Sequence, residues 1–183
     1  MNSVLSDTTT GTTLLVTGAQ LFDADSHTGT TADILVQDGL ITQIGSNLSS
    51  AGARRIDGAG LIALPGLVDL HTHLREPGFE ASETILTGTQ AAAAGGFTAV
   101  FAMANTSPVA DTAGVVEQEL ALGEAAGYAT VQPIGAVTVG QKGERLAELG
   151  AMAASKARVR VFSDDGTCVW DPLIMRRALE YVK

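Results

Sequence analysis

The chain contains little cysteine and few basic residues, and each shortage excludes a class of protein. The single cysteine of its 183 residues, Cys168, cannot form an intramolecular disulfide, which favours a reducing compartment. Lysine and arginine number 11 against 20 aspartates and glutamates, so the net charge is −9. Because the basic residues form no cluster, we do not expect nucleic acid as a partner.

The sequence also lacks a long apolar run. The longest weakly polar stretch, 91–104, is interrupted by two glycines and is shorter than the roughly 20 apolar residues of a membrane span. Residues 1–13 are polar and show neither the basic start nor the apolar run of a secretion signal. We therefore expect a cytoplasmic protein without a membrane partner. Its hydrophobic content of 45% is enough for a folded core.

Before Pro65, short apolar runs alternate with turn dipeptides. The dipeptides 38–39 and 57–58 are both Asp-Gly, which predicts hairpins because tight two-residue turns require positive φ. Residues 1–64 are therefore predicted to form a small antiparallel β unit, a β-sandwich segment. Its expected strands are 13–17, 33–37, 40–44, 54–56 and 60–64.

From Pro65 onward the pattern changes to strand then helix, four times over. The expected strands are 66–70, 97–103, 128–137 and 158–163, and the expected helices are 83–94, one starting at Asp111, 144–154 and 172–183. Apolar strands that alternate with helices indicate an α/β fold with a parallel sheet, either doubly wound or closed into a barrel. An eight-stranded (β/α)8 barrel takes about 250 residues, so 65–183 would supply about half of one, in about four βα units.

Two of the three histidines lie directly after the first of these strands, in His71-Thr72-His73. Side chains two apart on a strand share a face, so both imidazoles can bind one metal ion. The carboxyl ends of parallel barrel strands are also where active sites form. The alternative is a pair of ordinary loop histidines, and the position after a strand leads us to favour metal ligands.

Arg75 continues the alternation of the two histidines and is expected to face the same site. A guanidinium beside a metal cation requires an anion between them, and its planar fork suits a carboxylate, so a substrate with a carboxylate is implied. Pairing of Arg75 with Glu76 or Glu80 remains an equal alternative. Asn105, after the second strand, either donates to the same carboxylate or closes a turn, which is its more common role.

Asp164-Asp165-Gly166 ends the fourth expected strand. One of these acids is a candidate metal ligand, and the other has a structural role in a loop or helix cap. With His71 and His73 this gives three protein ligands, the number that a catalytic zinc ion keeps while leaving one position open.

The segment 64–78, LPGLVDLHTHLREPG, resembles the first-strand signature of the amidohydrolase superfamily, and its HLREPG portion resembles that of the long bacterial dihydroorotase family. Asn105 and the FSDDG of 162–166 match the same family, and the similarity runs from about residue 14 to residue 183. The resemblance implies a zinc enzyme of pyrimidine biosynthesis. Its reaction is the reversible cyclisation of N-carbamoyl-L-aspartate to L-dihydroorotate, with a zinc-activated hydroxide in the hydrolytic direction.

The resemblance also implies roles for individual residues. His71 and His73 would hold one zinc ion, and Asp165, with Asp164 as the second choice, would bridge to another. Arg75 and Asn105 would hold the substrate carboxylate. Complete members of the family add two histidines and a catalytic aspartate from later strands, so we expect the 183 residues alone to have little or no turnover.

Two alternatives remain. Hydantoinases, dihydropyrimidinases and allantoinases share the histidine pair but usually bridge their metals with a carboxylated lysine, whereas Lys142 and Lys156 are expected in or beside helices. The other alternative is a non-catalytic partner of aspartate transcarbamoylase, whose hallmark would be the loss of ligands. Expected protein partners are a second copy in a homo-oligomer or aspartate transcarbamoylase.

Overall fold

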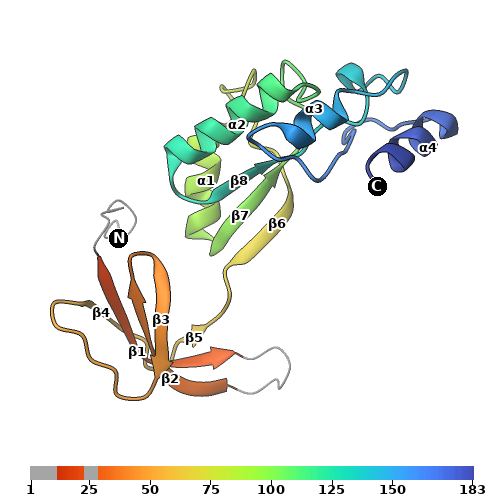
Figure 1. Ribbon diagram of the computed structural model, residues 1–183. Helices are drawn as coiled ribbons and strands as arrows, with labels where there is room; N and C mark the ends of the chain where they lie inside the picture. Colours follow the sequence, from red (N-terminus) through yellow and green to blue (C-terminus); the bar gives the residue numbers. More distant parts are fainter. Residues whose placement is uncertain (1–11, 23–28) are drawn as a thin grey trace. The chain divides into compact units, whose positions relative to one another are not determined.

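The computed structural model describes residues 12–22 and 29–183, and the chain divides into two compact units after Pro65 (Figure 1). The unit before this boundary is a β-sheet. The unit after it combines a parallel sheet with helices. None of the helices among the described residues is both long and apolar enough to cross a membrane.

The described part of the first unit is a sheet in the order β3-β2-β1-β4, with β5 also paired to β1. Its strands are β1 (Thr13–Phe22), β2 (Gly29–Gln37), β3 (Leu40–Gly45), β4 (Arg54–Asp57) and β5 (Ile62–Ala63). The pairs β1–β2 and β2–β3 are antiparallel, whereas β4 and β5 both run parallel to β1. The prediction of a purely antiparallel unit was therefore wrong for the last two strands.

The two Asp-Gly dipeptides explain this outcome. Asp38 and Gly39 have φ values of 51° and 78°, and they form the predicted hairpin turn between β2 and β3. At the second dipeptide, Gly58 donates its N–H to Thr17 O at 2.7 Å instead of closing a hairpin. A Cβ at residue 58 would lie 3.0 Å from that same oxygen, so glycine is needed there for close approach to β1.

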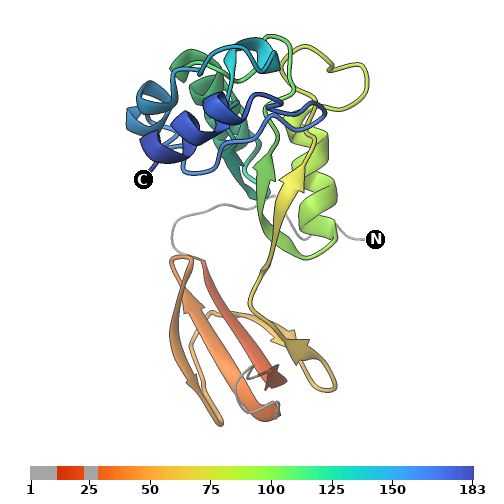
Figure 2. The same cartoon turned by 90° about the vertical axis from the view of Figure 1, so that its right-hand side faces the viewer.

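The second unit contains the parallel sheet β6-β7-β8 (Figure 2). Its strands are β6 (Leu67–Thr72), β7 (Phe97–Ala102) and β8 (Thr130–Pro133). Helix α1 (Ile85–Ala94) packs on β7, α2 (Ala113–Ala126) packs on β8, and the two helices contact each other. Between them and the sheet lies a buried apolar cluster of Leu74, Ile85, Val100, Ala102 and Val131. Because the strands are parallel, their carboxyl ends meet at one edge.

The helices begin where side chains satisfy their first N–H groups. Thr84 caps α1 by accepting from Thr87 N at 3.1 Å, and Asp171 caps α4 (Pro172–Tyr181) in the same way. The N-cap residue of α2 is Thr112, one residue later than predicted, because the carboxylate of Asp111 accepts from Gly140 N at 2.8 Å instead. Helix α3 (Leu149–Ala154) covers only the second half of its predicted span, and a short 3-10 turn, η1 (Val139–Gln141), precedes it.

The fourth predicted strand, 158–163, is absent from the described structure, which corrects the expected count of βα units. Only one parallel bridge, between Gly135 and Phe162, continues the sheet beyond β8. Arg158 has a left-handed backbone with φ 46°, and the guanidinium of Arg160 donates to the carbonyl oxygen of Val159 at 2.9 Å. Both features interrupt the extended ladder that a strand requires.

Candidate metal centre

His71 and His73 lie at the carboxyl end of β6, one inside the strand and one directly after it. Their ring centroids are 5.3 Å apart and the rings are inclined by 65°. The intervening Thr72 points away, because its hydroxyl donates to Phe101 O on β7 at 2.8 Å. The strand alternation therefore brings the two imidazoles together, as the sequence pattern predicts.

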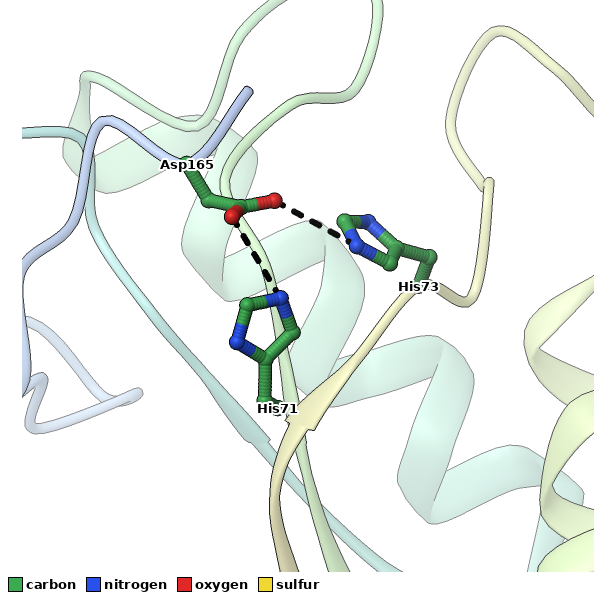
Figure 3. A group of neighbouring side chains, drawn as sticks. All are labelled: His71, His73 and Asp165. Carbon is green, nitrogen blue, oxygen red and sulfur yellow. Dashed lines mark ion pairs between the residues drawn. The ribbon is translucent and has the colours of Figure 1, made fainter. Parts of the chain in front are cut away.

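Asp165 approaches the two rings from a distant part of the chain and lies between them (Figure 3). His71 Nε2 is 3.4 Å from Asp165 Oδ1, and His73 Nε2 is 3.3 Å from Asp165 Oδ2. One potential ligand atom from each residue lies within 4.8 Å of the other two. The three side chains are 54%, 28% and 26% exposed in chain order, so a small molecule can approach the cluster from solvent.

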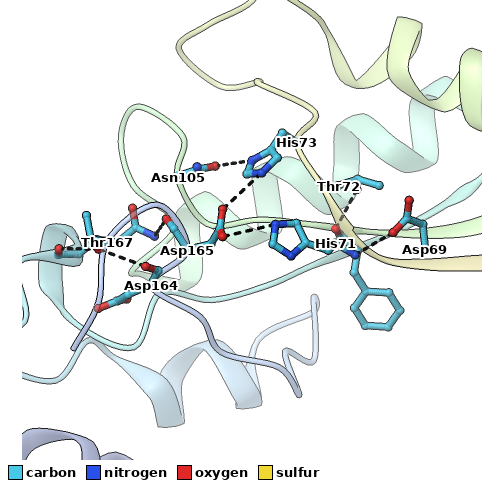
Figure 4. Close-up of polar contacts among 10 residues, drawn as sticks. Asp69, His71, Thr72, His73, Asn105, Asp164, Asp165 and Thr167 are labelled. Atoms are coloured by element: carbon cyan, nitrogen blue, oxygen red, sulfur yellow. Dashed lines mark hydrogen bonds and ion pairs between the residues drawn. The ribbon is translucent and has the colours of Figure 1, made fainter. Parts of the chain in front are cut away.

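The tautomer of His73 is set by Asn105, whose Oδ1 lies 3.0 Å from His73 Nδ1 (Figure 4). A carbonyl oxygen only accepts, so the proton of a neutral ring is on Nδ1 and the lone pair of Nε2 faces Asp165. A lone pair and a carboxylate oxygen repel each other unless a proton or a cation lies between them. A second ring nitrogen bound to an acceptor is typical of metal-ligating histidines, and two imidazoles with a carboxylate are donors that zinc accepts. The residues present therefore fit a zinc ion.

Asp164, the neighbouring acid, has a different environment. It is buried, and its carboxylate accepts from Val137 N at 2.8 Å, from Thr138 N at 3.1 Å and from the Thr138 hydroxyl. These donors occupy the carboxylate. Of the two acids left open by the sequence, the structure places Asp165 at the cluster and Asp164 within the fold.

Arg75 is not positioned by strand alternation. β6 ends at Thr72, and Arg75 has φ 63°, so the reason for expecting its side chain to face the site was wrong. Neither candidate acid pairs with it: Glu76 accepts a backbone N–H at the start of α1, and Glu80 accepts the N–H of Gly78. Among the described residues the Arg75 guanidinium has no ion-pair partner, which leaves its charge available for an anion.

Asn105 lies in the loop after β7, as predicted, but it does more than close a turn. Its carbonyl oxygen contacts His73, whereas its Nδ2 forms no hydrogen bond to the described protein. The amide nitrogen faces Gly166, where an added Cβ would lie 3.6 Å away. Asn105 can thus support a metal ligand and still donate to a bound molecule.

Glu119 on α2 is a buried acid that the sequence analysis missed. Its side chain is fully buried, Oε1 lies 3.4 Å from the hydroxyl of Thr106, and Oε2 has no partner among the described residues. Burial raises the pKa of Glu119 to about 8, and the Thr106 hydrogen bond opposes this shift. The available signal was its place three residues after the buried Val116, on the apolar face of the helix.

Comparisons with known proteins point to one family. A family model described as Dihydro-orotase-like matches residues 60–180. The dihydroorotase of Leifsonia xyli subsp. xyli is 74% identical over 93% of this chain and 38% of that protein, and the one of Streptomyces coelicolor is 62% identical over 92% and 38%. The L-hydantoinase (dihydropyrimidinase) structure from Arthrobacter aurescens aligns with a TM-score of 0.67 at 25% identity, covering 81% of this chain and 32% of its own.

The parallel α/β sheet, with the cluster at its carboxyl edge, thus shares its fold with part of the L-hydantoinase structure. The chain belongs to the dihydroorotase-like family. It spans about 38% of the length of the two curated relatives described above.

Proposed function

We propose that this chain supplies the metal centre and part of the substrate site of a dihydroorotase. The reaction is the reversible cyclisation of N-carbamoyl-L-aspartate to L-dihydroorotate in pyrimidine biosynthesis. The observation that carries the proposal is the meeting of two imidazoles and Asp165 around one point at the edge of a parallel sheet. The names and high identity of the curated relatives support the choice of reaction. On this proposal, β6, β7 and β8 are the first strands of a (β/α)8 barrel, in agreement with the alignment to L-hydantoinase.

His71, His73 and Asp165 would hold zinc, with one or two ions in a complete site. When bound there, zinc would supply a Lewis acid and lower the pKa of a coordinated water. The protein's own contribution is positional. In a neutral ring, the contact of His73 Nδ1 with Asn105 leaves Nε2 as the unprotonated nitrogen, and the side chain of Asp165 reaches both rings.

Arg75 and Asn105 would bind the carboxylate of the substrate. The guanidinium has no ion-pair partner in the described structure, and Asn105 Nδ2 is a free donor. A carboxylate on the ligand could pair with the guanidinium of Arg75, which favours dihydroorotate over neutral rings such as hydantoins. Lys142 lies at the end of η1 and Lys156 follows α3, so neither lies at the end of a strand of the parallel sheet, which favours dihydroorotase over hydantoinase or allantoinase.

A non-catalytic role beside aspartate transcarbamoylase is less well supported, because this chain retains all three candidate ligands. We infer a cytoplasmic enzyme acting on a small molecule. A second copy of the chain and aspartate transcarbamoylase are the protein partners to test by co-purification.

Zinc content of the purified chain tests the metal centre. We expect zinc in the parent chain by elemental mass spectrometry, and its loss in His71→Asn and in Asp165→Asn. His27→Asn changes the remaining histidine of the chain and should retain the metal. A parent chain that holds no more zinc than Asp165→Asn would refute the proposal. The expectation of little or no turnover by the 183 residues alone stays a prediction, checked by assaying ring opening of dihydroorotate.

A further inference from the structure

The carboxylate of Asp164 is buried next to the metal cluster without a cation to neutralise it. Only 6% of the residue is exposed, and no ion pair of the described chain includes it. Two backbone N–H groups and the hydroxyl of Thr138 donate hydrogen bonds to this carboxylate instead, and Thr138 is itself fully buried. A buried carboxylate held by several donors is costly to displace, because each lost donor leaves a buried charge less well solvated. The peptide at Asp164 is therefore fixed in place.

The segment 138–143 contacts the loop 164–167 at further points. The hydroxyl of Thr138 accepts from Gly143 N at 3.0 Å, so it bridges its own segment to the carboxylate of Asp164. The hydroxyl of Thr167 donates to Gln141 O at 3.2 Å, and Gln141 Nε2 lies 3.4 Å from Asp165 O, in position to donate.

The backbone conformation of residues 138–143 allows the contacts with the loop 164–167. Gly140, Gln141 and Gly143 have φ values of 59°, 56° and 72°. A non-glycine residue in the left-handed region is uncommon, and surrounding contacts must hold it there. At Gln141 both the carbonyl and the side chain contact the loop that carries the two acids.

The side chains of the adjacent residues Asp164 and Asp165 point in different directions. The carboxylate of Asp164 contacts Thr138 inside the unit. The carboxylate of Asp165 contacts His71 and His73 at 3.4 and 3.3 Å (Figure 4). We propose that Asp164, held by Thr138, is a positioning residue that sets the Asp165 carboxylate between the two histidines. This inference rests on the proposed metal centre. On this inference Asp165 contacts the metal, whereas Asp164 affects the metal only by positioning Asp165.

Zinc affinity, measured by competition with a chromophoric chelator, tests this role. Asp164→Asn removes the negative charge to which Val137 N, Thr138 N and the Thr138 hydroxyl donate, and Thr138→Val removes the hydroxyl while keeping the size of the side chain. Both variants should weaken zinc binding by about 10-fold, the lower end of what loss of a ligand's supporting partner costs, whereas Thr138→Ser should restore the parent affinity. The d–d absorption of the cobalt-substituted chain should change in the first two variants and not in the third.

Asp33→Asn is the matched control, because Asp33 also accepts two backbone N–H groups, from Gly18 at 2.8 Å and Leu48 at 2.9 Å, in the other unit. It should lower thermal stability and leave zinc affinity unchanged. If Asp164→Asn behaves like this control, with lower stability and the parent zinc affinity, Asp164 is merely structural and the inference is wrong. If circular dichroism shows that Asp164→Asn does not fold, the comparison of Thr138→Val with Thr138→Ser tests the inference instead. Equal zinc affinities of these two variants would overturn it. A parent chain that binds no zinc would instead overturn the metal centre, and this inference with it.

Discussion

His73 Nδ1 lies 3.0 Å from Asn105 Oδ1, so a residue after β7 sets the protonated nitrogen of a histidine after β6. The two residues are 32 positions apart in the chain and are brought together because parallel neighbours end at the same edge of the sheet. This contact leaves the other nitrogen of His73 facing Asp165 as a ligand. Substitution of Asn105 tests this contact directly.

Asn105→Ala should weaken zinc binding by about 10-fold, because His73 loses the acceptor that fixes its tautomer. Asn105→Asp keeps an oxygen at the same position and is the matched control. Chelator competition gives the affinities, and nitrogen NMR of the histidine ring reports the tautomer directly. Equal affinity and an unchanged tautomer in the alanine variant would show that the contact has no role in the metal centre.

Arg75→Met should weaken binding of dihydroorotate to the zinc-loaded chain by about 10- to 100-fold, the worth of a charge-assisted hydrogen bond to a carboxylate. Dihydrouracil has the same ring without the carboxylate, so its weaker binding should not change. Titration calorimetry with both ligands separates loss of the carboxylate contact from general damage to the site. An equal loss for both rings would contradict the assignment of Arg75.

Glu119 should make the stability of the second unit depend on pH. Burial raises the pKa of Glu119 to about 8 in the folded chain, well above its ordinary value of 4.5, so unfolding releases a proton between these pH values. Stability should therefore fall as pH rises through this window, by at most about 1.4 kcal/mol per unit, and level off beyond it. Urea unfolding at several pH values from 5 to 9 measures the slope.

Glu119→Gln should remove this slope, because the amide resembles the protonated acid and does not titrate. Glu117→Gln, on the same helix, is the control and should keep it, since Glu117 contacts the backbone of Lys156 at an exposed position. A parent slope that survives unchanged in Glu119→Gln would assign the pH dependence to other groups.

Gly78→Ala should destabilise the second unit more than an ordinary left-handed glycine does. Residue 78 has φ 101°, and a Cβ there would lie 2.2 Å from Ser107 O, so the loops after β6 and β7 would have to separate. Gly127→Ala is the matched control, because Gly127 has φ 69° and its nearest neighbour, Glu124 O, is 4.0 Å away. We expect about 1 kcal/mol for the control and about 2 to 4 kcal/mol for Gly78→Ala in urea unfolding. Equal losses of stability in the two variants would mean that the loops after β6 and β7 separate without a free-energy cost.

Local patterns in the sequence were sufficient for the features that depend on neighbouring residues. The alternation of side chains on a strand places His71 and His73 together, and the turn chemistry of Asp38-Gly39 specifies its hairpin. The order of strands and helices from β6 to β8 follows from runs of apolar residues and the glycines between them. In each case the deciding interaction lies within a few residues.

Contacts between distant residues settled the rest. Nothing local distinguishes Asp164 from Asp165, and their roles diverge because the donors at Val137 and Thr138, 27 and 26 residues before Asp164, contact only Asp164. The parallel pairing of β4 and β5 with β1, and the single bridge at Phe162 where a strand was expected, likewise depend on partners far along the chain. A hydrogen-bond donor or acceptor in the sequence does not specify its partner. That choice is made when packing brings the candidates together and leaves no water to take their place.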